Sequence, residues 1–344
     1  MPAWWLVPVL SGFFLSLLST EIVRSLAKRW KIVDVPSKDR KLHKKPMPMM
    51  GGAALAFSFS VVVIGVLIFT DHFTMGEITD LHFIGLLFGG WILIVGGLLD
   101  DLHDLPPYAS IIFPVLAALV AIFSGLGVSK LTNPAGGFFV VSEVASGVLT
   151  FIWLMGMIYT TKLLDGLDGL ATGVSAIGML IISFLALSTA FYQPDVALAS
   201  LIGFAVLLGF LLWNFYPATI FLGEGGSTYV GFLLGALAII SGSKIATALL
   251  VIGVPALDVG FVMFERWRAK QPIFSGGDNR HLHHKLLMAG LSHPAVVLLY
   301  YGLALAFGVA TLIFESWQKL LALSILFVMM LVLVKMLSLK TYEK

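Results

Sequence analysis

An apolar run that begins near residue 83 ends in the residues Gly96-Gly97-Leu98-Leu99-Asp100-Asp101-Leu102-His103-Asp104. Three carboxylates this close repel one another, and burying them without a cation or water costs free energy. On a helix, Asp100 and Asp104 share one face, while Asp101 points about 100° away from them. The stretch therefore predicts either the polar end of a membrane-spanning helix or an acidic site for a cation and phosphate groups at a membrane surface.

The composition of the whole chain favours a membrane protein. Of the 344 residues, 59% are hydrophobic and only 12% are charged, and the mean hydropathy is +0.99. A soluble protein cannot hide so much apolar surface. The chain contains no cysteine, which excludes disulfides and thiolate metal sites. The start, Met1-Pro2-Ala3-Trp4-Trp5, lacks the basic residues of a signal peptide and predicts a first span.

Apolar runs of about 17–25 residues cross a bilayer as helices. The predicted fold class is an all-α polytopic membrane protein with about eleven transmembrane helices, in which residues 1–344 form one integral-membrane domain. The expected spans are 4–26, 51–69, 83–99, 108–126, 146–159, 171–191, 196–215, 229–240, 245–263, 295–313 and 320–339.

Lysine and arginine gather on one side of this eleven-span arrangement, above all in the loops that follow the first and ninth spans. Positive residues favour the cytoplasmic side, so we expect the N-terminus outside, the C-terminus inside and a location in the inner (plasma) membrane. Every dense polar cluster falls on that same side. A transporter or flippase would place polar groups through the bilayer depth. One-sided clusters favour an enzyme that takes a soluble substrate from the cytoplasm and a lipid from the bilayer.

A second acidic cluster reads Asp165-Gly166-Leu167-Asp168-Gly169. The two carboxylates are three residues apart and face one site if the segment is helical. A helix cap would need only one of them.

The eighth span is preceded by Gly223-Glu224-Gly225-Gly226-Ser227. Glycines let backbone N–H groups approach phosphate, and a helix N-terminus favours an anion. The spacing is not that of a Walker motif. Two other roles are open for Glu224. It binds the metal ion that accompanies the phosphates, or it caps the helix.

Two basic clusters lie on the same side. The first loop contains His43 and Lys45, which either anchor the chain to anionic headgroups or bind a lipid phosphate. The second reads Arg280-His281-Leu282-His283-His284, where no acid stands at metalloprotease spacing, so diphosphate and sugar binding is favoured over zinc. Asp258, late in the ninth span, needs a partner, for which Arg266 or Arg268 is expected.

In this order and on one membrane side, the four clusters resemble the polyprenyl-phosphate N-acetylhexosamine-1-phosphate transferases of glycosyltransferase family 4. The resemblance runs from about Asp34 to the last span. It implies a UDP-amino-sugar donor, a polyprenyl-phosphate acceptor and dependence on Mg²⁺, with Mn²⁺ as an alternative. It also allows a homodimer, and binding to nucleic acid is not expected.

Details within the resemblance point to a branch of the family. The members that transfer phospho-MurNAc-pentapeptide usually carry Lys where this chain has Asp104. The run at 278–287 looks like the bacterial GlcNAc-1-phosphate branch, which starts cell-envelope glycans such as O-antigen and teichoic acid, so UDP-GlcNAc is the expected donor. The alternatives are the pentapeptide transferase and, from another class, a lipid-linked-sugar flippase. The chain departs from the family in Lys162, where Asn is usual, and in Glu224, where Asp is usual.

The resemblance and the residues together imply attack of the lipid phosphate on the β-phosphorus of UDP-GlcNAc, which gives polyprenyl-diphosphate-GlcNAc and UMP. The residues expected to be catalytic are Asp100, Asp101, Asp104, Asp165 and Asp168. Those expected to bind substrate are Lys45, His43, Lys162, Gly225, Ser227, Arg280, His281, His283 and His284. Those expected to bind metal are Asp165, Asp168 and Glu224.

Overall fold

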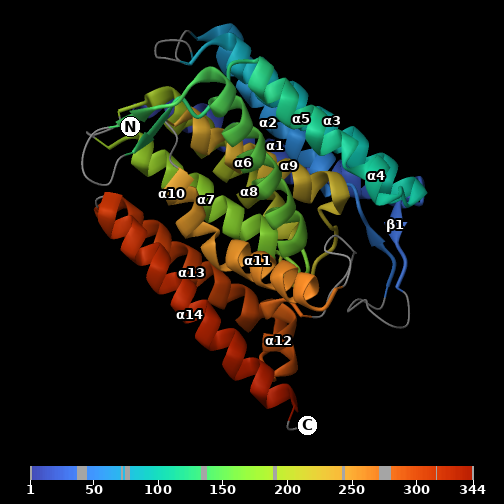
Figure 1. The fold of residues 1–344 in the computed structure, drawn as a ribbon. Helices are drawn as coiled ribbons and strands as arrows, with labels where there is room; N and C mark the ends of the chain where they lie inside the picture. The colour runs from blue at the N-terminus through green and yellow to red at the C-terminus, as the bar shows by residue number, and fades with distance from the viewer. Residues whose placement is uncertain are drawn as a thin grey trace.

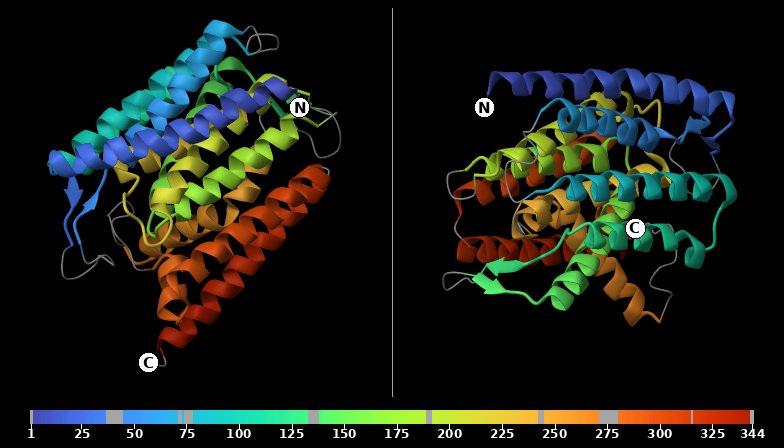
Figure 2. Two further views of the ribbon diagram at one scale, coloured as in Figure 1. Left: turned by 180° about the vertical axis from the view of Figure 1, so that it is seen from behind. Right: turned by 90° about the horizontal axis from the view of Figure 1, so that it is seen from above.

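The computed structural model describes residues 2–36, 45–70, 73, 78–132, 138–188, 192–241, 245–270, 280–314 and 316–342. In these ranges the chain is an elongated bundle of helices with two small hairpins (Figures 1 and 2). The N-terminus and the C-terminus lie at opposite ends of the bundle (Figure 1). His43 lies outside the described residues, so its expected role stays a prediction.

Seven of the described helices are long and apolar enough to cross a membrane. They are α1 (Leu6–Arg29, after a 3-10 turn at Ala3–Trp5), α2 (Gly51–Phe69), α3 (Asp80–His103), α6 (Glu143–Leu164), α8 (Pro194–Asn214), α9 (Gly223–Ile240) and α13 (His293–Ile313). The other helices are α4 (Pro107–Ser110), α5 (Ile112–Phe123), α7 (Leu170–Ala186), α10 (Ile245–Val251), α11 (Gly253–Arg268), α12 (Leu282–Met288) and α14 (Ser316–Tyr342). The chain is thus an all-α multi-pass membrane protein, as predicted. Each expected span falls on a helix or on two consecutive helices, but the count of eleven stays a prediction.

Helix α9 lies at the centre of the bundle, where α2, α3, α6 and α7 pack around it (Figure 1). Of the 18 residues of α9, 83% are buried, whereas only 28% are buried in the most apolar 18-residue stretch of α1 and the turn before it. A helix that is apolar on all sides is buried on all sides, whereas an outer helix of a membrane bundle shows its apolar face to lipid. The N-terminus of α9 is therefore fixed by its neighbours.

Small residues let these helices approach closely. A Cβ atom on Gly97 of α3 would overlap the backbone of Gly225, and one on Gly52 of α2 would overlap Gly226. Packing of this kind is the usual way in which helices associate in lipid. Because Gly52 packs within the chain, it gives no support to the homodimer that the family resemblance allows.

The ninth expected span is divided in two at Ile252, between α10 and α11. Gly253 and Pro255 follow this point. Gly has a low helix propensity, and Pro has no N–H to bond the preceding turn, so a break is expected here. Helix α11 leaves the break carrying Asp258.

Two antiparallel hairpins join the helices. Strands β1 (Val33–Asp34) and β2 (Met47–Pro48) pair in the loop after α1, and β3 (Lys130–Thr132) pairs with β4 (Phe138–Val140) in the segment between α5 and α6. The end of β2 is bonded to the segment before α9, because Phe221 donates its N–H to the Pro48 carbonyl at 2.8 Å. The first hairpin thus reaches the end of the bundle at which α9 begins.

Candidate active site

The polar clusters expected to share one membrane side meet at one end of the bundle. The end of α3, the turn between α6 and α7, the start of α9 and the residues just before α12 all lie there (Figure 1). Two side-chain contacts tie the end of α3 and the end of α6 to the start of α9: Asp101 with Glu224, and Lys162 with Glu224. A third, Asp168 with Ala218, ties the turn between α6 and α7 to the segment after α8.

Asp101 caps helix α9 from the neighbouring helix. Its Oδ1 and Oδ2 accept the backbone N–H of Glu224 at 3.3 Å and 3.2 Å. A carboxylate at a helix N-terminus is stabilised by the helix dipole. Gly223 makes this approach possible, because its φ of +74° suits glycine and a side chain there would meet Asp101 and Met49. The capping role considered for Glu224 therefore belongs to Asp101.

The expectation that Asp100 and Asp104 share a helix face is wrong. Helix α3 ends at His103, and Asp104 follows it with a left-handed φ of +47°. Because the helix stops before this residue, its side chain leaves the face that carries Asp100. Asp104 is exposed, whereas Asp100 is partly buried and repels the carboxylate of Glu224.

The condition placed on Asp165 and Asp168 also fails, because these residues lie in a turn between α6 and α7 and not in a helix. Oδ2 of Asp168 accepts the N–H of Ala218 at 2.9 Å, which ties the turn to the segment after α8. The pKa of Asp165 is nevertheless raised well above its usual value, first by burial and then by the charges of Glu224, Asp168 and Asp101. The carboxylates therefore do converge, through tertiary packing and not through helical spacing.

Lys162, in the last turn of α6, forms an ion pair with Glu224. The ammonium group also lies 5.7 Å from the centre of the Tyr159 ring. The lysine and glutamate side chains are 29% and 19% exposed, so water screens the pair only in part. The two departures from the family pattern, Lys162 and Glu224, are thus partners in one ion pair.

The histidine cluster is held by Asp258. Oδ2 of Asp258 lies 2.8 Å from Nδ1 of His281, and Oδ1 accepts the N–H of Leu282 at 2.8 Å. Arg266 or Arg268 was the expected partner, whereas these contacts come from the first residue of α12 and from His281, which precedes it.

His283 extends the histidine cluster to the second acidic cluster. Its ring stacks on that of His281 with centroids 5.6 Å apart, and a Cβ atom on Gly166 would overlap its Nε2. Burial, with the charges of His284, His281 and His293, lowers the pKa of His283 well below its usual value. A neutral imidazole beside the turn at 165–169 can accept or donate a hydrogen bond but brings no positive charge.

We expect Asp258→Ala to lower the free energy of unfolding by about 2–3 kcal/mol, because the buried Leu282 N–H and His281 lose their shared acceptor. The midpoint of thermal unfolding in detergent measures the effect. Asp80→Ala, at an exposed position in the first turn of α3, is the control and should change stability by less than about 0.5 kcal/mol. Equal shifts for the two variants would contradict a structural role for Asp258.

The remaining expected substrate-binding residues are placed as follows. Lys45 is exposed just before β2, and Arg280 is partly buried just before His281. Gly225 is buried against Ile94. The hydroxyl of Ser227 donates a hydrogen bond to the carbonyls of Gly223 and Glu224, both at 3.2 Å. Substrate contacts at these residues stay predictions.

Two neighbours of the acidic turn were not predicted. The hydroxyl of Tyr301 donates to the carbonyl of Gly169 at 2.6 Å. The ring of His293 lies against that of Tyr216, tilted by 34°, and is beside Asp168. Both come from α13, far along the chain. No local pattern in the sequence could have joined them to residues 165–169.

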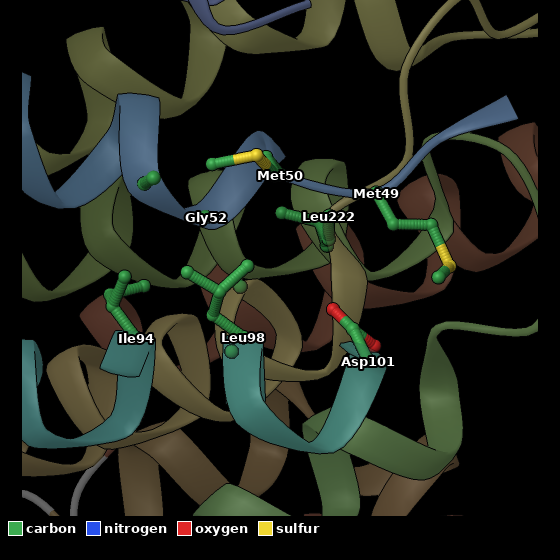
Figure 3. Close-up of a pocket in the computed structure, with 10 residues that line it drawn as sticks. Met49, Met50, Gly52, Ile94, Leu98, Asp101 and Leu222 are labelled. Atoms are coloured by element: carbon green, nitrogen blue, oxygen red, sulfur yellow. The ribbon is translucent and has the colours of Figure 1, made fainter. Parts of the chain in front are cut away.

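A small, mostly apolar pocket adjoins Asp101 (Figure 3). It lies between α2, α3 and the start of α9 and is lined by Met49, Leu98 and Leu222 among others. Figure 3 shows the carboxylate of Asp101 at one side of the pocket. Asp101 therefore borders an apolar surface on one side and the N-terminus of α9 on the other.

The donor groups fit Mg²⁺ only in part. Carboxylate oxygens are the ligands that Mg²⁺ prefers, and Asp165 and Glu224 are close enough to repel each other. However, within the described part of the chain no three acidic or histidine side chains are arranged to hold a metal ion. Mg²⁺ is commonly bound by one or two carboxylates together with substrate phosphates. The cluster fits an ion of that kind, completed by phosphate oxygens, and does not fit a cage made by protein alone.

The fold and this site define a class: a multi-pass membrane protein with acids, a lysine and histidines gathered at one end of its helical bundle. The chain belongs to glycosyl transferase family 4, whose family model matches residues 83–242. It is 34% identical, over 95% of its length and 90% of the relative, to a probable undecaprenyl-phosphate N-acetylglucosaminyl 1-phosphate transferase of Bacillus subtilis.

Two further relatives extend the similarity. A decaprenyl-phosphate N-acetylglucosaminephosphotransferase of Mycolicibacterium smegmatis is 32% identical over 94% of this chain and 86% of the relative. An undecaprenyl-phosphate alpha-N-acetylglucosaminyl 1-phosphate transferase of Escherichia coli K12 is 27% identical over 88% and 82%. The family predicted from the four clusters is confirmed.

Proposed function

We propose that this protein transfers GlcNAc-1-phosphate from UDP-GlcNAc to polyprenyl phosphate, with undecaprenyl phosphate as the expected lipid. The products are polyprenyl-diphosphate-GlcNAc and UMP, and the reaction commits the sugar to the membrane for cell-envelope glycan synthesis. The observation that carries the proposal is the convergence of Asp101, Asp165, Lys162 and Glu224 at one end of the bundle. The names of the relatives support the sugar and the lipid.

In the reaction an oxygen of the lipid phosphate attacks the β-phosphorus of the donor, and the bond from that phosphorus to the bridging oxygen breaks, so that UMP leaves. Both substrates are anionic, so positioning and charge neutralisation provide most of the catalysis. We assign Asp100 to accept a proton from the lipid phosphate or to orient it. Lys45 and His43 are assigned to that phosphate as charged donors.

The binding of UDP-GlcNAc is assigned to a second group of residues. Arg280 and the three histidines bind the diphosphate and the sugar, and the neutral His283 does so by hydrogen bonds. When bound, Mg²⁺ supplies positive charge to the diphosphate, and Asp165 and Glu224 are the residues that would hold it. Asp168 is the third expected ligand, although its Oδ2 already accepts the N–H of Ala218.

We infer that the site faces the cytoplasm from the inner (plasma) membrane. Among the described residues, Lys162 at the end of α6, Arg266 and Arg268 at the end of α11, and Arg280 just before α12 lie at the end of the bundle that carries the acids, and positive residues favour the cytoplasm. UDP-sugars are soluble, so this end is also where the donor would arrive.

The proposal is tested by UMP release from detergent-purified protein with polyprenyl phosphate. UDP-GlcNAc, UDP-GalNAc and UDP-MurNAc-pentapeptide are supplied separately, with Mg²⁺ and with excess chelator. We expect release with UDP-GlcNAc and Mg²⁺ only, and none without the lipid. Release with the pentapeptide donor alone would move the protein to the peptidoglycan branch of the family. No release with any donor, from folded protein, would contradict the proposal.

A further inference from the structure

The acidic cluster has a cation of its own. Asp101, Asp165 and Glu224 are mutually repelling carboxylates, and Asp100 adds to the field at Glu224. The ammonium group of Lys162 is paired with Glu224. The lysine is therefore the cation that the structure pairs with this cluster.

The position of the lysine is set by more than the ion pair. Its side chain leaves the last turn of α6, a helix packed against α9, and its ammonium group lies near the face of the Tyr159 ring. An aromatic face attracts a cation, most strongly where water is partly excluded. Lys162 is therefore held over the first turn of α9, where Glu224 lies.

An ammonium group and a divalent cation compete for the same carboxylate oxygens. While Glu224 is paired with Lys162, its carboxylate is not free to bind a divalent cation. The ammonium charge also repels that cation, with an energy given by Coulomb's law in a partly screened medium. A nucleoside diphosphate changes this balance, because its oxygens offer the ammonium group a new partner and the metal new ligands.

We propose that Lys162 is a resident cation that occupies Glu224 until the donor arrives, so that a divalent cation binds well only together with a diphosphate. The inference rests on the proposed function for the claim that a metal belongs in this cluster. Its test uses no lipid and no turnover, so the two claims fail separately.

The experiment is Mn²⁺ binding to detergent-purified protein without nucleotide, measured by the loss of the free-ion electron paramagnetic resonance signal. We expect Lys162→Gln to lower the Kd for Mn²⁺ about tenfold relative to the unchanged protein. Lys162→Asn is the second neutral variant, since Asn is usual here in the family. Either variant is sufficient for the test if a thermal unfolding transition shows that it is folded. Lys162→Arg keeps the charge and should bind Mn²⁺ as weakly as the unchanged protein.

Two controls locate the effect. Lys28→Gln removes the same charge from an exposed position at the end of α1 and should leave the Kd unchanged. The double variant Lys162→Gln/Glu224→Gln should lose the gained affinity, because the freed carboxylate is gone. A Kd for the folded neutral variants within twofold of the unchanged protein would overturn the proposal, as would a gain that persists in the double variant.

Discussion

Replacing Asp165 by Asn is expected to lower the initial rate of UMP release by about 10²–10³-fold. The amide keeps the shape of the side chain but can neither carry a negative charge nor accept a proton. Burial, and after it the charges of Glu224, Asp168 and Asp101, raise the pKa of Asp165 well above its usual value. Loss of this group should therefore affect the rate far more than the stability. Release of UMP from UDP-GlcNAc and polyprenyl phosphate, at saturating donor and Mg²⁺, measures the effect.

Asp195→Asn is the matched control. Asp195 is a buried carboxylate in the first turn of α8, at the opposite end of the bundle, and it bonds the N–H of Val196. This variant should release UMP at close to the rate of the unchanged protein. If Asp165→Asn stayed within threefold of the unchanged rate, Asp165 would not be a catalytic residue.

Gly97→Ala is expected to lower both the stability of the bundle and the rate of UMP release. The added Cβ atom would overlap the backbone of Gly225, so α3 and α9 would have to move apart. Overpacking of this kind costs about 1–3 kcal/mol. The same movement would pull Asp101 away from the Glu224 N–H, so UMP release should fall as well. The thermal unfolding midpoint in detergent and the rate of UMP release are measured on the same preparation.

Gly156→Ala gives the opposite expectation for the same chemical change. Gly156 lies within α6, and a Cβ atom there meets nothing within 4 Å. Alanine is a better helix former than glycine by about 1 kcal/mol, so this variant should be as stable as the unchanged protein or more so. If Gly97→Ala matched it in both measurements, the close approach of α3 and α9 would not be required.

Most of the fold could be predicted from the sequence because hydrophobic runs locate helices in a membrane protein directly. Helix α2 has the bounds predicted for the second span. Predicted ends were wrong where tertiary contacts set them. Helix α9 begins at Gly223 and not near 229, because Asp101 of another helix caps it. Helix α6 extends to Leu164, so Lys162 lies in its last turn.

The members of the site were easier to predict than their pairing. The composition of each cluster indicates chemistry, but which carboxylate faces which cation depends on how helix ends are rotated and where each helix stops. Asp104 leaves the face of Asp100 because α3 ends one residue earlier. The pairs Lys162–Glu224 and Asp258–His281 join residues 62 and 23 positions apart, which no helical period relates. Only the packed bundle identifies these pairs.

The proposed reaction transfers the sugar together with one phosphate, and a donor labelled in that phosphate shows whether this happens. UDP-GlcNAc carrying ³²P in the β-phosphate is incubated with the protein, polyprenyl phosphate and Mg²⁺, and the lipid is extracted. We expect label in the lipid fraction and unlabelled UMP in the aqueous fraction, in equal molar amounts. Label that stays in aqueous UDP while the lipid gains sugar would show transfer of the sugar alone, and the protein would not be a sugar-1-phosphate transferase.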